Sequence, residues 1–292
     1  MKKILITTMI LMLGLALYSE AIIIRSSDMS RIKLSELTED LMQYDLIFFG
    51  EHHGNQDLHA LQKDILPGLI RDERNLILSF EMWERDTQDL LDAFLKAEIT
   101  EESFTDESRA WPNYADYRPL ILFAKEHDLT SIAANVPRIY ASRTAREGWD
   151  FVRDLPPNER ELIAQDLTAP DDQYKKEFMH AMNAMSAHTM DRESMDRFYM
   201  AQTIKDDTMA ESIVRALRSS PDSRLIHFNG DFHSRSFLGT VSRVREALPK
   251  IKIAVLTPAR DSGNISDLKP EVAQAIGTHI IVLPTPPAEE PK

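Results

Sequence analysis

The sequence of 292 residues contains no cysteine. Without a thiol the chain has no disulfide bond, no thiolate metal site, no cysteine nucleophile and no cysteine to carry a lipid. Positive charge is also scarce, because 34 Lys and Arg residues face 47 Asp and Glu residues, for a formal net charge of −13. Nucleic-acid binding needs clustered cations, so this charge argues against a nucleic-acid partner. Any bound group must be held by His, Glu, Asp, Tyr or Met.

Long hydrophobic runs are absent after the first twenty residues. At the start, Lys2 and Lys3 precede an uncharged apolar run over residues 4–18, and Ala21 closes a short segment typical of signal-peptide cleavage. We expect residues 1–21 to be a signal peptide, with an uncleaved anchor as the alternative. No later segment is suited to span a bilayer. The sequence therefore predicts an exported protein of the periplasm or cell envelope that is not lipid-anchored through cysteine.

Apolar strand-like runs alternate with helical spacing along the mature chain. Buried strands are predicted near residues 45–49, 75–82, 129–136, 225–229, 253–256 and 280–283. Residues 99–116 are predicted to be a loop, and Pro119 to lie in the first turn of the helix that follows. This alternation is typical of α/β proteins with a mostly parallel central sheet flanked by helices.

The alternation stops after residue 139. No strand is predicted between residues 140 and 199, which read as a smaller all-helical insertion, and a long helix is expected over 191–219. The predicted organisation is a signal peptide (1–21), the first part of an α/β domain (22–139), the helical insertion (140–199), the second part of the α/β domain (200–284) and a disordered tail (285–292).

Acidic residues and histidines follow three of the predicted strands. Glu51 and His53 come after the first strand, Glu81 lies at the end of the second, and His233 follows a later one. The carboxyl ends of parallel strands meet at one edge of a sheet, where ligands bind. We therefore predict that these four side chains form one cluster. Either they run acid–base catalysis, or they bind a divalent metal ion such as Zn, Mn or Fe.

Six stretches resemble the signature blocks of the ChaN-like haem-binding uptake family and occur in that family's order. They are GEHHGN (50–55), SFEM (79–82), DYRPL (116–120), NVPR (135–138), AQTIKDDTMA (201–210) and NGDFH (229–233). The resemblance implies an α/β core with a smaller helical domain. It also implies haem as the cofactor, bound in the cell envelope for iron acquisition.

The wider superfamily includes the Tiki/TraB proteins and the erythromycin esterases. Its hydrolases, some metal-dependent, carry acid and histidine motifs that match Glu51, His53, Glu81 and His233. Family members are often lipoproteins, and this chain departs from that pattern because it has no cysteine. The partners that we consider are haem, an outer-membrane receptor or other uptake system, and a second copy of the chain in a homodimer.

For haem we predict a site in the insertion, where seven methionines lie between Met179 and Met209. Methionine adapts to irregular apolar surfaces, and Tyr, His and Met all ligate haem iron. The candidate residues are Tyr174, His180, His188, Tyr199, Met182 and Met185, with Arg138 as a cation for the propionates. Two alternatives are that the methionine stripe is hydrophobic core, or that it forms a Met/His copper site.

We therefore expect an exported haem-binding protein of the cell envelope that takes part in haem and iron uptake. The alternative is an envelope hydrolase, esterase-like or peptidase-like, that uses the Glu/His cluster with or without a metal ion. In a third interpretation the cluster is a relic in a non-catalytic binding protein. The sequence leaves open whether the protein is an enzyme.

Overall fold

A computed structural model describes residues 22–185, 191–260 and 268–283. The predicted signal peptide (1–21) and the predicted disordered tail (285–292) lie outside the described residues. Among the helices within them, none combines the length and the apolar character needed to cross a membrane.

Within these residues, eight strands form a single sheet in the order β2-β1-β8-β7-β3-β6-β4-β5. The strands are β1 (Ile22–Arg25), β2 (Ser30–Ile32), β3 (Leu46–Glu51), β4 (Leu76–Glu84), β5 (Ser131–Asn135), β6 (Arg224–Gly230), β7 (Ile253–Arg260) and β8 (His279–Leu283). β1 runs antiparallel to β2 and β8, and all other neighbours are parallel. The predicted fold class, α/β with a mostly parallel sheet, is confirmed.

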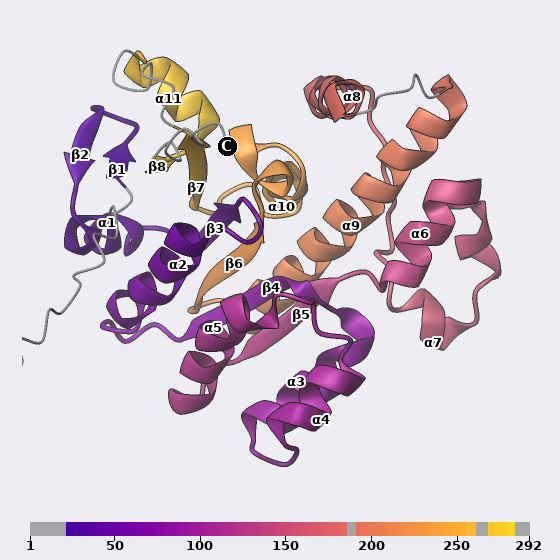
Figure 1. Cartoon of the computed structure of the whole chain (residues 1–292), viewed down its shortest axis with the longest axis horizontal. Coiled ribbons are helices and arrows are strands. Elements are labelled where there is room, and N and C mark those ends of the chain that lie inside the picture. Colours follow the sequence, from indigo (N-terminus) through magenta and orange to yellow (C-terminus); the bar gives the residue numbers. More distant parts are fainter. Residues whose placement is uncertain (1–21, 186–190, 261–267, 284–292) are drawn as a thin grey trace, which may run out of the picture.

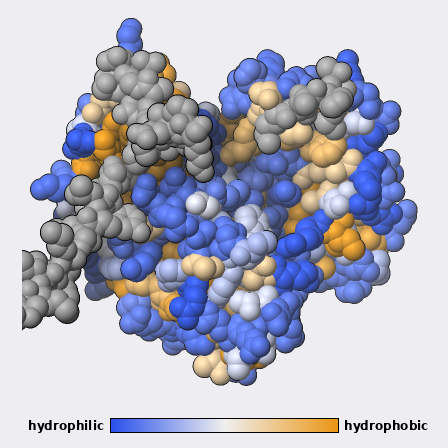
Figure 2. Space-filling view, viewed as in Figure 1, coloured by the Kyte–Doolittle hydropathy of each residue, from blue (hydrophilic) through white to orange (hydrophobic). Residues whose placement is uncertain are grey.

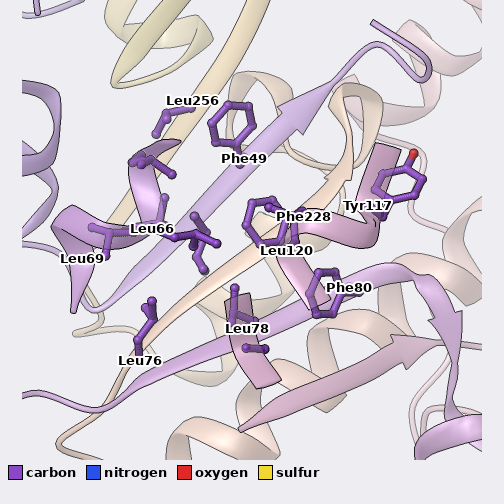
Figure 3. Packing of buried hydrophobic residues seen from close by; sticks show 14 of the residues in the cluster. Phe49, Leu66, Leu69, Leu76, Leu78, Phe80, Tyr117, Leu120, Phe228 and Leu256 are labelled. Carbon is purple, nitrogen blue, oxygen red and sulfur yellow. The ribbon is translucent and has the colours of Figure 1, made fainter. Parts of the chain in front are cut away.

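Side chains alternate between the two faces of the central strands, as the period of a β-strand requires. In β3, Ile47 and Phe49 enter one hydrophobic core, whereas Leu46 and Phe48 enter the core on the opposite face. Both faces of the sheet are thus covered, which explains why this strand is apolar at consecutive positions. Figure 3 shows Phe49 in the larger core beside side chains from neighbouring strands and helices.

Helices cover the two faces in separate groups (Figure 1). The larger core contains side chains from α1 (Leu34–Leu41), α2 (Gln56–Leu69), α3 (Gln88–Leu95), α4 (Glu101–Glu107) and α5 (Tyr114–Glu126). The opposite core contains side chains from α9 (Arg192–Ser219) and α10 (Thr240–Ala247). The short α11 (Pro270–Ile276) packs near β8 and β1.

Three further helices lie between β5 and α9: α6 (Arg138–Glu147), α7 (Pro157–Arg160) and α8 (Gln173–Met185). The long helix expected over 191–219 is confirmed by α9. Its first turns pack with α8 through Met195 and Tyr199, and its later turns pack on the sheet through Ile213 and Leu217. Because α9 serves both regions, the boundaries of a separate insertion stay a prediction.

The loop predicted over 99–116 is wrong, because α4 lies within it and α5 begins at Tyr114. The side chain of Thr100 caps α4 by accepting a hydrogen bond from the Ser103 amide, and two glutamates follow in its first turn. Phe104 then stacks on Phe94 with ring centroids 4.8 Å apart. Pro119 consequently lies beyond the first turn of α5, contrary to the prediction.

Candidate functional site

The predicted Glu/His cluster lies where three parallel strands end side by side. β6 pairs with β3 on one side and with β4 on the other, so the carboxyl ends of these strands meet. Glu51 pairs in register with Gly230, and His233 follows Gly230 in a short helical turn. We call Glu51, His53, Glu81 and His233, together with Asp206 of α9, the sheet-edge cluster.

Glu51 is a fully buried carboxylate that holds His53. Its Oε1 accepts hydrogen bonds from His53 Nδ1 at 2.7 Å and from the Tyr117 hydroxyl at 2.6 Å, and its Oε2 accepts one from Gln62 Nε2 at 2.6 Å. Figure 3 shows the Tyr117 hydroxyl pointing away from the apolar side chains of the core. The His53 side chain is 47% exposed, so it is the member of this group that a solute can reach.

Gly230 lets His53 and Glu81 approach each other. A Cβ atom at this position would lie 2.8 Å from His53 Nε2 and 3.6 Å from Glu81 Oε2. The Gly230 amide also donates to Glu81 Oε2 at 2.6 Å. Any larger residue would push the imidazole away, so the glycine is needed for space.

His233 is buried between two carboxylates. Its Nδ1 donates to Asp206 Oδ1 at 2.8 Å, and its Nε2 lies 3.4 Å from Glu81 Oε1. Asp206 also accepts from the hydroxyls of Tyr174 and Thr240, each at 2.8 Å. One imidazole thus links β4, the turn after β6, and α9.

Electrostatics give the cluster a fixed pattern of charge. Burial opposes the ionisation of His233, Glu81 and Asp206 alike. The two carboxylates nevertheless raise the pKa of His233 to about 10. In return, the charge and hydrogen bonding of His233 hold the pKa values of Glu81 and Asp206 below their usual range despite burial. At neutral pH the triad is therefore an imidazolium between two carboxylates.

The other histidines near the cluster behave differently. The hydrogen bond with Glu51 raises the pKa of His53, although burial acts against it. Burial lowers the pKa of His227, which lies beneath the cluster and bonds to Ser79, to about 3. His233 is thus a fixed cation and His227 a neutral ring. Of these three histidines, His53 is the exposed one, so it is the one placed to exchange a proton with a solute.

The predicted divalent-metal role of Glu51, His53, Glu81 and His233 is not supported. Across the described ranges, no three His, Asp or Glu side chains are grouped so that they could hold a metal ion. The ring nitrogens of His233 face two carboxylates, and one nitrogen of His53 is bonded to Glu51. The residues that would serve as ligands are therefore paired with one another.

Two of the predicted haem ligands lie in a hydrophobic core. Tyr174 and Tyr199 are buried with Phe178 and Met195. The Tyr174 hydroxyl donates to Asp206, and the Tyr199 hydroxyl donates to the Pro170 carbonyl at 3.0 Å. In this conformation neither hydroxyl is available to iron, and both rings are packing residues.

The remaining haem candidates are scattered. His180 is exposed on α8, and Met182 of the same helix packs at the margin of the Tyr174 core. Arg138 bonds to Glu84 at 2.8 Å and to the Arg109 carbonyl, so it belongs to a separate ion-pair group. The side chain of Met185 and the whole of His188 lie outside the described part of the structure.

A groove lies between α8 and the start of α9. Its volume is about 340 Å³, and it is lined by Asp171, Lys175, Met179, Asn183, Arg192, Met195 and Asp196. We call it the α8–α9 groove. Figure 2 shows hydrophobic residues interspersed with hydrophilic ones over these two helices. Phe198, one helical turn beyond Met195, adds an exposed aromatic ring, with 39% of its surface accessible.

Sequence reasoning did not assign a role to Asp206, Tyr117 or Gln62. Asp206 carried a detectable signal, because it lies three residues before Met209 and seven before Ile213, on the apolar stripe of an amphipathic helix. A carboxylate at such a position needs a buried partner, which here is His233. Gln62 and Tyr117 gave no comparable signal, since both residue types are common on helices.

The family model described as haem-binding uptake, Tiki superfamily, ChaN matches residues 37–244. This match includes every member of the sheet-edge cluster and the whole of α8. The chain belongs to the ChaN family of haem-binding uptake proteins. No curated protein matches the sequence.

One solved structure shows the same fold as this ChaN-family chain, and two others are similar to a lesser degree. ChaN of Campylobacter jejuni, whose structure describes cofacial haem binding, matches with a TM-score of 0.70 and 16% identity, over 90% of this chain and 96% of the other. An erythromycin esterase mutant in its open conformation matches with a TM-score of 0.46 and 12% identity, over 77% of this chain and 72% of the other. A succinoglycan biosynthesis protein matches with a TM-score of 0.49 and 10% identity, over 83% of this chain and 73% of the other.

The raised pKa of His233 predicts an alkaline loss of stability. The folded protein holds this proton up to about pH 10, whereas the unfolded chain releases it near pH 6.5. The contribution is therefore complete below about pH 6.5 and is lost as the pH rises toward 10, by up to about 1.4 kcal/mol per pH unit. We expect the unfolding free energy, measured with urea, to fall less steeply with pH in His233→Gln than in the wild type.

His127→Gln, at an exposed position, is the matched control and should keep the wild-type slope. Equal slopes in the wild type and in His233→Gln would contradict the buried imidazolium.

Proposed function

We propose that this protein binds haem in the α8–α9 groove and takes part in haem and iron uptake. Membership of a haem-binding uptake family supports the ligand, and the chemistry of the groove supports the place. Met179 and Met195 offer polarisable apolar contacts, and Arg192 offers a cation for a propionate. Lys175 is paired with Asp196 at 2.8 Å, so a propionate would have to replace that carboxylate to reach it. Arg138, which sequence reasoning favoured for the propionates, does not line the groove and is paired with Glu84.

The size of the groove suits a carrier. Its volume of about 340 Å³ is at the lower end of the range of roughly 300–1,000 Å³ for small-molecule sites. A flat macrocycle in it keeps one face or edge open. That openness favours transfer of haem to a partner such as a receptor or uptake system over permanent retention of the cofactor.

Among the described residues, His180 is the histidine carried by the helix that borders the groove, and we propose it as the ligand of the iron. It is exposed on α8, next to Met179 and three residues before Asn183, and both of these residues line the groove. Tyr174 and Tyr199, by contrast, have their hydroxyls engaged in the core. Haem supplies an iron centre and a broad apolar surface, and the chain supplies an imidazole, thioethers and cations.

We expect His180→Ala to raise the Kd for haemin at least about tenfold and to change the Soret maximum, because an axial ligand is lost. Titration of haemin followed by Soret absorbance measures both. His127→Ala, which changes an exposed histidine at the C-terminal cap of α5, should behave like the wild type. A wild-type protein that takes up no haemin would contradict the proposed function, and an unchanged His180→Ala spectrum would contradict this ligand.

We propose further that the protein is exported, on the strength of the layout of residues 1–21. Protein recovered from the native envelope should then begin near Ile22 when its N-terminus is sequenced. Cytoplasmic protein with an intact Met1 would contradict this proposal.

Hydrolysis at the sheet-edge cluster is the second candidate function. The observation that favours it is His53, half-exposed, oriented by the buried Glu51 and adjacent to the ionised Glu81 across Gly230. An imidazole held by one carboxylate beside another is arranged for general acid–base chemistry, with His53 moving the proton.

If this cluster is catalytic, His53→Gln and Glu81→Gln should each lower ester hydrolysis by about 10²–10⁴-fold, and the double variant should lose no more than the worse single variant. Initial rates with p-nitrophenyl esters measure this, and His127→Gln is the control. Wild-type rates equal to those in buffer, or variants as active as the wild type, would remove the hydrolase from consideration.

A further inference from the structure

Helix α8 packs against the rest of the described structure through aromatic rings, beside an ion pair between Lys175 and Asp196 of α9. Tyr174 and Phe178 of α8 pack against Phe232, with ring centroids 5.2 and 6.2 Å apart, and Phe178 packs against Tyr199 of α9 at 5.4 Å. Phe232 lies between Asp231 and His233 in the turn after β6. The helix that bears the α8–α9 groove thus rests directly on the turn that carries His233.

A chain of hydrogen bonds runs through the same contact. The buried Tyr174 hydroxyl accepts from Gln202 at 3.1 Å and donates to Asp206 Oδ2 at 2.8 Å. The other oxygen of Asp206 bonds to His233, whose Nε2 faces Glu81. Tyr174 is the one residue in this series of hydrogen bonds that comes from α8. The helix that borders the groove therefore supplies a hydrogen-bond donor to Asp206 of the sheet-edge cluster.

We propose that Tyr174 is a positioning residue that couples the α8–α9 groove to the sheet-edge cluster. A ligand held against α8 alters the hydrogen-bonded arrangement of Asp206, His233 and Glu81, and this arrangement in turn alters the affinity of the groove. The inference rests on the proposed binding of haem in the groove.

The physical reason is that Asp206 and Tyr174 are buried, Phe232 is half-buried, and each is in direct contact with its partners, so that none of them can move alone. Asp206 is an ionised, fully buried carboxylate, so the loss or lengthening of one donor bond is not made good by water. Phe232 and the phenol ring of Tyr174 are in contact, so a displacement of α8 also moves the His233 turn. Coupling between two sites is reciprocal in free energy. If a ligand in the groove changes the stability of the hydrogen-bonded arrangement at the cluster, a change in that arrangement must also change the affinity of the groove.

The test is a double-mutant cycle on porphyrin affinity. Glu81→Gln changes the cluster without touching α8 or the groove, and its amide oxygen can still accept from the Gly230 amide. We expect it to change the Kd for haemin at least about fivefold in the wild-type background and less than twofold in the Tyr174→Phe background. Tyr174→Phe keeps the ring and removes only the hydroxyl.

Tyr199→Phe is the matched control, because it removes a hydroxyl from the same core that bonds to the Pro170 carbonyl and not to Asp206. In that background the fivefold effect of Glu81→Gln should remain. An equal effect in the Tyr174→Phe and Tyr199→Phe backgrounds, or no effect in the wild type, overturns the coupling. Haemin that fails to bind the wild type overturns the proposed function instead.

A measurement on the wild type alone covers the case in which a variant does not fold. Gallium protoporphyrin, a diamagnetic stand-in for haem, should shift the backbone amide resonances of Gly230 and His233 as well as those of α8. If the α8 resonances shift while those of Gly230 and His233 do not move, the two sites are independent and the inference fails.

Discussion

The buried imidazolium of His233 is the interaction on which the site depends. Glu81 and Asp206 are both inaccessible to water, and each stays ionised because the same cation lies within 3.4 Å of it. An unpaired buried carboxylate costs several kcal/mol, so removal of the cation would leave two such charges in the interior. The imidazolium also fixes geometry, because it joins β4, the turn after β6 and α9. The close approach at Gly230 then sets His53 beside Glu81.

The ionised side chains of the sheet-edge cluster and the methionine-lined α8–α9 groove lie in separate regions of the molecule. The sheet-edge cluster is compact and internally paired, and one accessible imidazole, His53, connects it to solvent. The α8–α9 groove is open, rich in methionine and edged by Lys175 and Arg192. We propose the groove, and not the cluster, as the place for haem, with its broad apolar ring and two carboxylates. Tyr174 belongs to α8, the helix that borders the groove, and it contacts Phe232 and donates to Asp206 of the cluster. The two regions are therefore in contact through this residue.

Much of the fold follows from the sequence, because β3 is a continuous apolar run, β6 contains apolar residues at most of its central positions, and in both a glycine is followed by an acidic residue. The pairing of Glu51, His53, Glu81 and His233 follows from strand direction alone. The sequence does not predict the short elements. β1 and β2 are too short to show periodicity. The acidic composition of α4 resembles that of a loop, and the sequence does not show that Phe104 is buried. Tyr174 and Tyr199 stay candidate haem ligands by residue type alone, because a residue type does not show whether its hydroxyl already has a partner. Tyr174 has two.

The position of iron in crystals grown with haemin tests the central claim most directly. Anomalous scattering recorded at the iron absorption edge locates the metal without reference to the protein's side chains. The account predicts a peak beside α8, within ligand distance of His180 and next to the groove lined by Met179 and Met195. A peak at the sheet-edge cluster, or on the face covered by α3 and α5, would contradict it.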